Sequence, residues 1–305
     1  ISTPFELTGE AVDPDGDELT YSWEQFDLGP ATDTEADVNN PTGTAPIFRA
    51  WEPSESPTRV FPRITDLVNN TTVLGELLPT YERLMTFRFI ARDNQMGGGG
   101  VDYDEIQFQV SEITGPFEVI SPNDGTEEWA AGANAIVTWD VANTTEAPVS
   151  CSSVNLLLSV DGGLTYPFEL AMNVPNTGTA NVLVPNGVIP DGVDEITTCR
   201  VKVQSVGNIF FDISNTNFTI GEPTEPDFTV FINDPSIETC SPANVTSQIS
   251  LSSLVGFASE VDMTVEGLPA GATADFIVKN TIRGGSDQIN EVTFDQNDRQ
   301  SYKNI

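Results

Sequence analysis

The chain has 305 residues, 46 of them acidic and 12 basic, so its formal net charge is −34. Binding to nucleic acid needs basic patches that neutralise phosphates, and this composition excludes it. Histidine is absent, which removes the usual general base and the commonest zinc ligand. No apolar run is long enough to span a bilayer, so we also expect no membrane insertion. These features predict a chain that is not an enzyme and holds no zinc.

Short alternating apolar runs, with 24 glycines and 21 prolines between them, predict an all-β fold. An immunoglobulin-sized sandwich takes about 100 residues, so we expect three tandem immunoglobulin-like or fibronectin-like β-sandwich modules. Two Pro-containing segments at 112–116 and 222–226 are typical of linkers. They place the modules at residues 1–111, 117–221 and 227–305.

In the first module, period-two alternation predicts strands at Leu19/Tyr21/Trp23 and Ile106/Phe108/Val110. The stretch from Asp27 to Pro62 is rich in Pro, Thr and Asp and is too irregular for regular strands. We predict that it forms a long surface loop inserted into the sandwich.

An acidic turn precedes the first of these strands and contains Asp13, Asp15 and Asp17 around Gly16. Carboxylates at alternating positions suit a hard cation such as calcium. Further oxygens could come from Asp93, Asp102 and Asp104 if their turn lies at the same end of the sandwich. The alternative is an Asx-rich hairpin turn that binds no ion.

The second module has predicted strands at Val137/Trp139/Val141, Val154/Leu156/Leu158/Val160, Val201/Val203 and Phe218/Ile220. Cys151 and Cys199 both fall in this module, whereas Cys240 falls in the next. We therefore expect a Cys151–Cys199 disulfide, which implies an oxidising compartment. Cys240 is expected to have no partner within the chain.

One turn of this module resembles the Asp-box hairpin of sialidases and other β-proteins, through Ser159, Asp161, Gly163 and Thr165. The resemblance implies a folding device in which the Asp and hydroxyl side chains cap the turn. A sialidase would need several such boxes and an arginine triad, so we expect a structural role alone.

The four tryptophans allow a carbohydrate-binding alternative, because aromatic rings can stack on sugars. Trp23 and Trp139 lie on the apolar side of alternating strands, where a core role is expected. Trp51 and Trp129 are in loop-like contexts, so a sugar-binding role stays open for them.

The third module begins with predicted strands at Phe228/Val230/Ile232, Ile249/Leu251 and Val261/Met263/Val265. The alternation fades after about Gly284, before a seventh strand is reached. The last strands therefore lie beyond this stretch or come from another chain. An open sheet edge of this kind could also pair with other copies.

Several segments resemble the region that follows the catalytic domain in secreted reprolysin-like zinc metallopeptidases of Bacteroidetes-type bacteria. They include residues 3–25, 56–63, 121–125, Val137-Thr138-Trp139-Asp140 and 267–272, so the resemblance covers most of the chain. It implies a parent protein with a propeptide, a zinc peptidase domain, immunoglobulin-like or fibronectin-like modules and a type IX secretion sorting domain. The Asp-Pro-Asp-Gly-Asp turn also resembles calcium-binding cadherin-like and polycystic-kidney-disease-like repeats. The zinc motif His-Glu-x-x-His is missing here, so no peptidase activity carries over.

From these observations we expect a non-catalytic accessory segment of an exported bacterial protein, acting outside the cell or at its surface as a spacer, stabiliser or binding region. Its partner is then the rest of its own precursor. The alternative is an adhesin or extracellular fibre subunit built from β-sandwich repeats.

Overall fold

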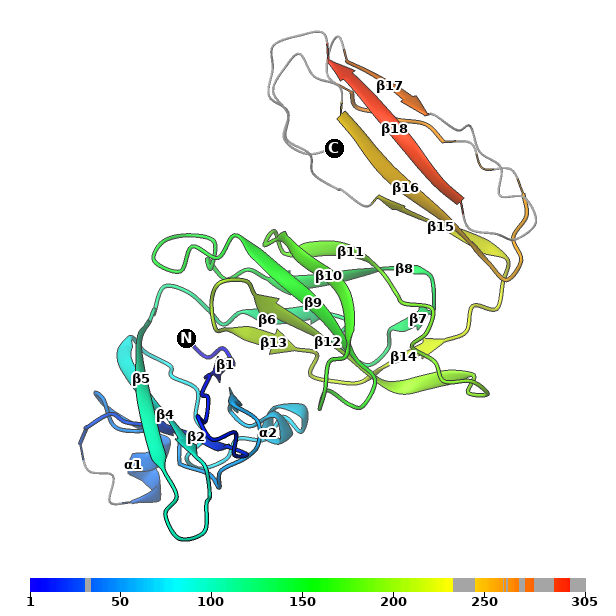
Figure 1. Ribbon diagram of the computed structural model, residues 1–305. Coiled ribbons are helices and arrows are strands. Elements are labelled where there is room, and N and C mark those ends of the chain that lie inside the picture. The colour runs from blue at the N-terminus through cyan, green and yellow to red at the C-terminus, as the bar shows by residue number, and fades with distance from the viewer. Residues whose placement is uncertain are drawn as a thin grey trace. The chain divides into compact units, whose positions relative to one another are not determined.

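The computed structural model describes residues 1–30, 34–232, 245–259, 261, 263–268, 272–276 and 288–296, and Figure 1 labels their elements in chain order. Strands dominate, with two helices of five residues each among the described residues, so the predicted all-β class is confirmed. No described helix has the length and apolar character needed to cross a membrane. The chain forms two compact units, one made of Ile1–Glu127, Ile136–Ala180 and Ile196–Thr219 and the other of the remaining segments. The division into modules at 1–111, 117–221 and 227–305 stays a prediction.

Residues 1–111 form two small antiparallel sheets. Their elements are β1 (Phe5–Thr8), β2 (Thr20–Gln25), α1 (Glu35–Asn39), β3 (Thr58–Phe61), α2 (Ile64–Val68), β4 (Arg83–Arg92) and β5 (Val101–Val110). One sheet pairs β1 with β3, and the other has the order β2-β4-β5. Aromatic rings fill the space between them: Phe5 stacks on Phe61 at 4.8 Å, and Phe61 meets Phe87 edge-on at 4.8 Å. The core is thus built from the apolar side of each alternating strand.

The stretch from Asp27 to Pro62 is not simply a surface loop, which corrects the prediction. It contains α1 and β3, and Ile47, Phe48 and Phe61 are among its buried side chains. Irregular backbone can enter a core when its polar groups find partners. Here the Gln25 side-chain oxygen accepts the N–H groups of Ile47 and Phe48 at 2.7 and 2.9 Å.

The middle of the chain contributes nine strands. They are β6 (Glu118–Ser121), β7 (Glu128–Ala130), β8 (Asn134–Asp140), β9 (Ser153–Ser159), β10 (Phe168–Pro175), β11 (Thr179–Leu183), β12 (Glu195–Ser205), β13 (Phe211–Ile213) and β14 (Phe218–Gly221). One sheet follows the order β10-β9-β12-β14-β7 with β13 on β12, and a second has the order β11-β8-β6. The predicted alternation is confirmed, because Trp139, Leu156, Leu158 and Val203 are all buried.

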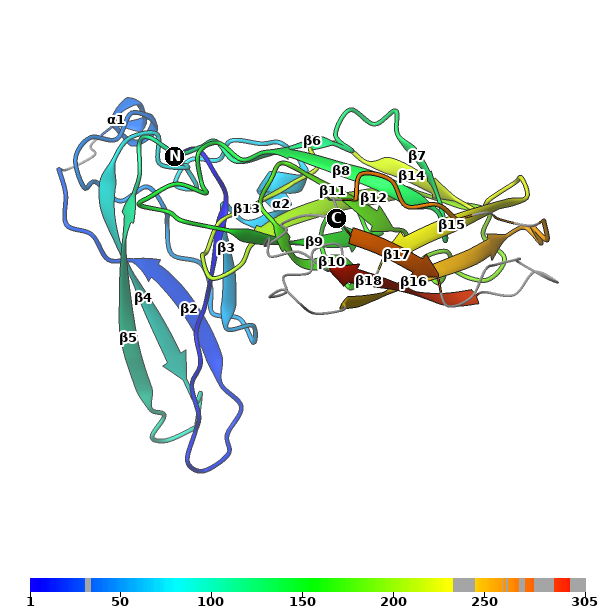
Figure 2. The ribbon, with the colours of Figure 1, turned by 90° about the horizontal axis from the view of Figure 1, so that it is seen from above.

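Within the first unit, residues 1–111 join the following segment by direct backbone pairing. Phe5 forms an antiparallel bridge with Phe210, and Phe211 donates its N–H to the Pro4 carbonyl at 3.0 Å. The Glu6 carboxylate forms an ion pair with Lys202 at 2.7 Å and accepts a hydrogen bond from Gln204. Figure 2 shows the start of the chain running beside β13, which these bonds explain.

The C-terminal region forms one antiparallel sheet of order β15-β16-β18-β17. Its strands are β15 (Asp227–Ile232), β16 (Val245–Leu254), β17 (Ala272–Phe276) and β18 (Gln288–Gln296). Val261, Met263 and Val265 do not form the predicted strand but pack as non-strand residues against Ile249 and Leu251. The sheet also extends beyond Gly284, where the alternation of the sequence fades. Residues 288–296 form β18, which pairs with β16 along its length.

Candidate functional site

The predicted calcium residues gather partly at one end of the β2-β4-β5 sheet. Four of them, Asp13, Asp93, Asp102 and Asp104, line one hollow of about 550 Å³. Asp17 instead lines a neighbouring hollow together with Asp93. No three acidic, Cys or His side chains of the described residues converge closely enough to hold a metal ion. Calcium at this end stays a prediction.

The acidic side chains of this region cap the protein's own backbone. Asp13 Oδ1 accepts the N–H groups of Asp15 and Asp17 at 2.8 and 3.1 Å, which is an Asx turn. Asp93 accepts the N–H groups of Gln95 and Gly100, and these bonds lower the pKa of its carboxyl group. Asp13 Oδ1 and both carboxylate oxygens of Asp93 therefore take part in turn formation.

The Asp-box turn between β9 and β10 uses all four residues that the sequence singles out. Ser159 Oγ donates to Asp161 Oδ1 at 2.7 Å and accepts the Gly163 N–H at 2.8 Å. Asp161 also accepts the Thr165 hydroxyl at 2.6 Å and the backbone N–H groups of Leu164 and Thr165. Burial acts to raise the pKa of Asp161, but these hydrogen bonds together lower it. The side chain thus closes the turn as a charged carboxylate.

Gly163 marks the place where this turn meets the first part of the chain. Its φ is +91°, a conformation that favours glycine. A Cβ atom there would lie 2.9 Å from Arg200 Cδ and 3.0 Å from Val68 Cγ1, at the end of α2. A side chain here would therefore make Arg200 or Val68 shift, so the glycine lets the turn and α2 approach this closely.

The predicted Cys151–Cys199 disulfide is wrong. Arg200 pairs with Ser159 and Ser205 with Val154, so Cys199 lies near Val160 while Cys151 precedes the other end of β9. The seven residues of β9 alone separate those ends by about 20 Å, whereas a disulfide needs Cα atoms within about 7 Å. Both cysteines are buried, and no bond joins them. Burial raises the pKa of the Cys151 thiol, and the argument for an oxidising compartment loses its support. Cys240 lies outside the described residues.

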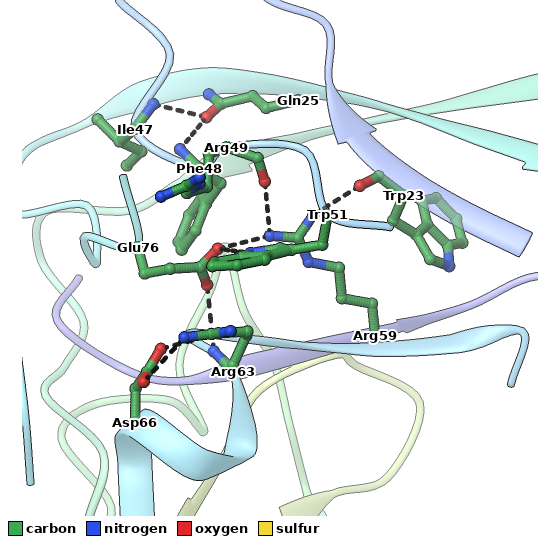
Figure 3. A network of polar contacts seen from close by, with 10 residues as sticks. All are labelled: Trp23, Gln25, Ile47, Phe48, Arg49, Trp51, Arg59, Arg63, Asp66 and Glu76. Atoms are coloured by element: carbon green, nitrogen blue, oxygen red, sulfur yellow. Dashed lines mark hydrogen bonds and ion pairs between the residues drawn. The ribbon is translucent and has the colours of Figure 1, made fainter. Parts of the chain in front are cut away.

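The four tryptophans differ in their surroundings, and two of them lie in the core as predicted. Trp23 and Trp139 are 6% and 2% exposed, which confirms their core role. Trp51 lies between two cations, with the guanidinium carbon of Arg49 4.4 Å and that of Arg63 3.6 Å from its ring centre. Figure 3 shows these groups on either side of the ring, so it offers no open face to a sugar. The carbohydrate-binding alternative then depends on Trp129, half-buried on β7.

A buried ion pair organises the loops around Trp51 (Figure 3). The Glu76 side chain is fully buried, and its Oε1 lies 2.7 Å from the Arg59 guanidinium. The same oxygen accepts the Trp51 indole N–H at 2.5 Å, and Oε2 accepts the Arg63 backbone N–H. Arg59 further donates to the carbonyls of Trp23 and Arg49 at 2.6 and 2.9 Å. The Glu76 carboxylate and the Arg59 guanidinium thus connect β2 and β3 with the loops that carry Arg49 and Trp51.

Burial has opposite effects on the two charges of this pair. It raises the pKa of Glu76 and lowers the pKa of Arg59, because each charged form loses hydration. The ion pair acts against both shifts, and the hydrogen bonds from Trp51 and Arg63 further oppose the rise in the pKa of Glu76. Sequence reasoning missed this pair, although one signal was visible: Glu76 interrupts the apolar run Val73-Leu74-Gly75-Glu76-Leu77-Leu78.

A second acid, the half-buried Asp212 on β13, has no cation paired with it among the described residues. Its Oδ2 accepts the Val119 N–H of β6 at 2.7 Å. Burial raises the pKa of Asp212 to about 7, and the backbone hydrogen bonds only partly oppose this. Asp212 therefore titrates near neutral pH in the folded protein.

The junction of the first two segments encloses an apolar hollow of about 430 Å³. Its walls include Phe5, Ile106 and Phe108 on one side and Phe117, Val149 and Ile209 on the other. Ile106 is 39% exposed, so the hollow opens beside β5. A pocket of this size with few polar groups can take apolar side chains rather than polar or charged ligands.

Comparison with known proteins yields little. No family model matches the chain, and no curated protein matches it. Among solved structures, the crystal structure of chicken CNTN1 FN1-FN3 domains matches with 13% sequence identity over 100% of this chain and 84% of that chain, at a TM-score of 0.22. The resemblance to secreted metallopeptidases stays a prediction.

Proposed function

We propose that the chain is a non-catalytic extracellular accessory segment of an exported bacterial protein, with a reprolysin-like zinc metallopeptidase as the parent. Its role is to hold a neighbouring domain through rigidly joined β-sandwich modules. The observation that carries this proposal is the junction within the first unit, where the Phe5–Phe210 bridge and the Glu6–Lys202 ion pair join residues 1–111 to the following segment. A flexible tether needs no such pairing, whereas a stiff spacer does.

Hydrogen exchange of the full chain tests the spacer role. If the junction couples the two segments, protected amides of β4 and of β9 open in one cooperative event. Glu6→Gln removes the ion pair at unchanged size, and we expect it to separate the two opening events. Glu105→Gln, in the exposed Arg88–Glu105 pair of the same unit, is the matched control and leaves them coupled. Independent opening in the unmodified chain would contradict the proposal.

The parent and the lack of activity need separate tests. Sequencing the gene on both sides should reveal a peptidase domain with His-Glu-x-x-His upstream. The purified chain should hydrolyse neither proteins nor glycans, with or without added zinc, because it has no histidine and its sequence shows no recognisable pair of carboxylates in a cleft. Zinc-dependent turnover by a sequence-verified sample would overturn the assignment.

An adhesin or fibre subunit is the second candidate, favoured by the C-terminal sheet. Its described strands form one layer, ending in β15 on one side and β17 on the other. Such terminal strands can accept a strand from a neighbouring chain. Regular filaments in electron micrographs of native material would favour this candidate over the spacer.

A further inference from the structure

Strand β5 is a ten-residue edge strand that the fold leaves accessible. It ends the path β2-β4-β5, and no strand of the described residues pairs with its other side. Seven consecutive residues from Val101 to Gln107 are exposed. Long exposed edges template pairing with other chains, and natural proteins usually block them.

The first half of β5 is blocked by its own side chains. Asp102 Oδ1 accepts the N–H of Tyr103, and Asp104 Oδ1 accepts the N–H of Glu105, both at 2.8 Å. Because N–H groups alternate in direction along a strand, these donors point away from β4. The carboxylates therefore occupy the sites where a neighbouring strand would pair.

The second half of β5 lacks such caps and borders the apolar hollow. By the same alternation, the N–H and C=O groups of Gln107 and Gln109 point toward the free edge. Ile106 and Phe108 alternate with these two residues and line the 430 Å³ hollow at the junction. A strand laid along this half would meet open backbone groups and place alternate side chains over an apolar space.

We propose that this edge, residues 101–110, binds an extended cationic peptide segment of a partner protein. The segment pairs with Gln107 and Gln109, puts apolar side chains into the hollow, and brings lysine or arginine side chains to Asp102 and Asp104. Charge selects this occupant: the acidic caps attract cations, and a net charge of −34 opposes pairing with a second copy.

Binding of a blocked peptide of about ten alternating lysine and valine residues to the full chain tests the proposal. Isothermal titration at about 150 mM salt limits unspecific attraction. We expect Gln107→Pro to weaken binding about tenfold, because it removes an edge N–H at unchanged charge. Tyr103→Pro is the matched control: its N–H is already capped by Asp102, so affinity should stay within about twofold.

Two further measurements do not depend on how the variants fold. The same peptide with alternate amides N-methylated cannot pair with the edge and should bind at least about tenfold more weakly. A peptide with glutamate in place of lysine should not bind. Equal affinity for any of these peptides, or for Gln107→Pro, would overturn the proposal. So would a concentration-dependent dimer, in sedimentation, that Gln107→Pro abolishes.

Discussion

Glu76 and Asp212 are two carboxylates whose pKa is raised by burial, yet the protein gives them different partners. Glu76 has a guanidinium at 2.7 Å and an indole N–H, so its charge is balanced inside the core. Asp212 has backbone N–H donors, and burial raises its pKa to about 7. At Glu76 an ion pair opposes the rise in pKa that burial causes, whereas at Asp212 backbone hydrogen bonds oppose it.

The largest effect should follow Glu76→Gln. This change leaves the Arg59 guanidinium buried without its counter-charge, and breaking such a pair typically lowers the free energy of unfolding by about 3–5 kcal/mol. Chemical denaturation measures the loss. Glu105→Gln in the exposed Arg88–Glu105 pair should cost less than about 1 kcal/mol. Similar losses in both variants would mean that the buried pair has no special role.

The raised pKa of Asp212 predicts that the folded protein loses stability as the pH rises toward neutrality. Its pKa is raised in the folded state, so between about pH 4 and pH 7 the folded protein retains a proton that the unfolded chain releases. This contribution to stability is complete below the unfolded pKa and is lost as the pH rises toward 7. An asparagine side chain cannot ionise, so Asp212→Asn should avoid this loss of stability. We expect it to raise the free energy of unfolding at pH 8 by on the order of 2 kcal/mol. Thermal melts of both proteins at pH 5 and pH 8 measure this difference, and an equal effect at both pH values would contradict it.

Asp161→Ala should have a smaller effect of about 1 kcal/mol, since it removes the acceptor for several turn hydrogen bonds that water can partly replace. Asp13→Ala, which removes only two backbone bonds in an exposed turn, should cost less. Urea denaturation of the two variants compares the turns directly. A larger loss for Asp13→Ala would show that the acidic turn does more than cap its backbone.

Calcium at the acidic turn stays a prediction with its own test. A bound ion at Asp13, Asp15 and Asp17 should raise the melting temperature with calcium over that with chelator at matched ionic strength, and Asp15→Asn should weaken this response. The same melting temperature under both conditions would show that the turn only caps its own backbone.

Features that depend on local spacing could be predicted from the sequence. Alternation located β5, β9 and the buried Trp23 and Trp139, because the period of a strand is two. The Asp-box spacing likewise identified its turn, since all its bonds span four residues or fewer.

Features that depend on how distant segments meet could not be predicted. The disulfide failed because only the register of β9 against β12 shows that the cysteines lie at opposite ends. The partner of Glu76 was hidden because Arg59 lies 17 residues away, in a strand that the sequence pattern does not reveal. Part of the inserted stretch looked like a loop because the backbone of Ile47 and Phe48 is bonded by a side chain, Gln25, rather than by a neighbouring strand.

The glycine at the tip of the Asp-box turn constrains how this protein can be rebuilt. A methyl group at position 163 would lie 2.9 Å from Arg200 Cδ and 3.0 Å from Val68 Cγ1, so the sequence of one turn affects how closely a different part of the chain can dock. Grafting the segment that carries this turn onto another protein would keep its internal hydrogen bonds and the positive φ that favours glycine, but not its contact with α2. Gly163→Ala would strain the turn and press on Arg200 and Val68 at once, so turn geometry and docking cannot be redesigned separately at this position.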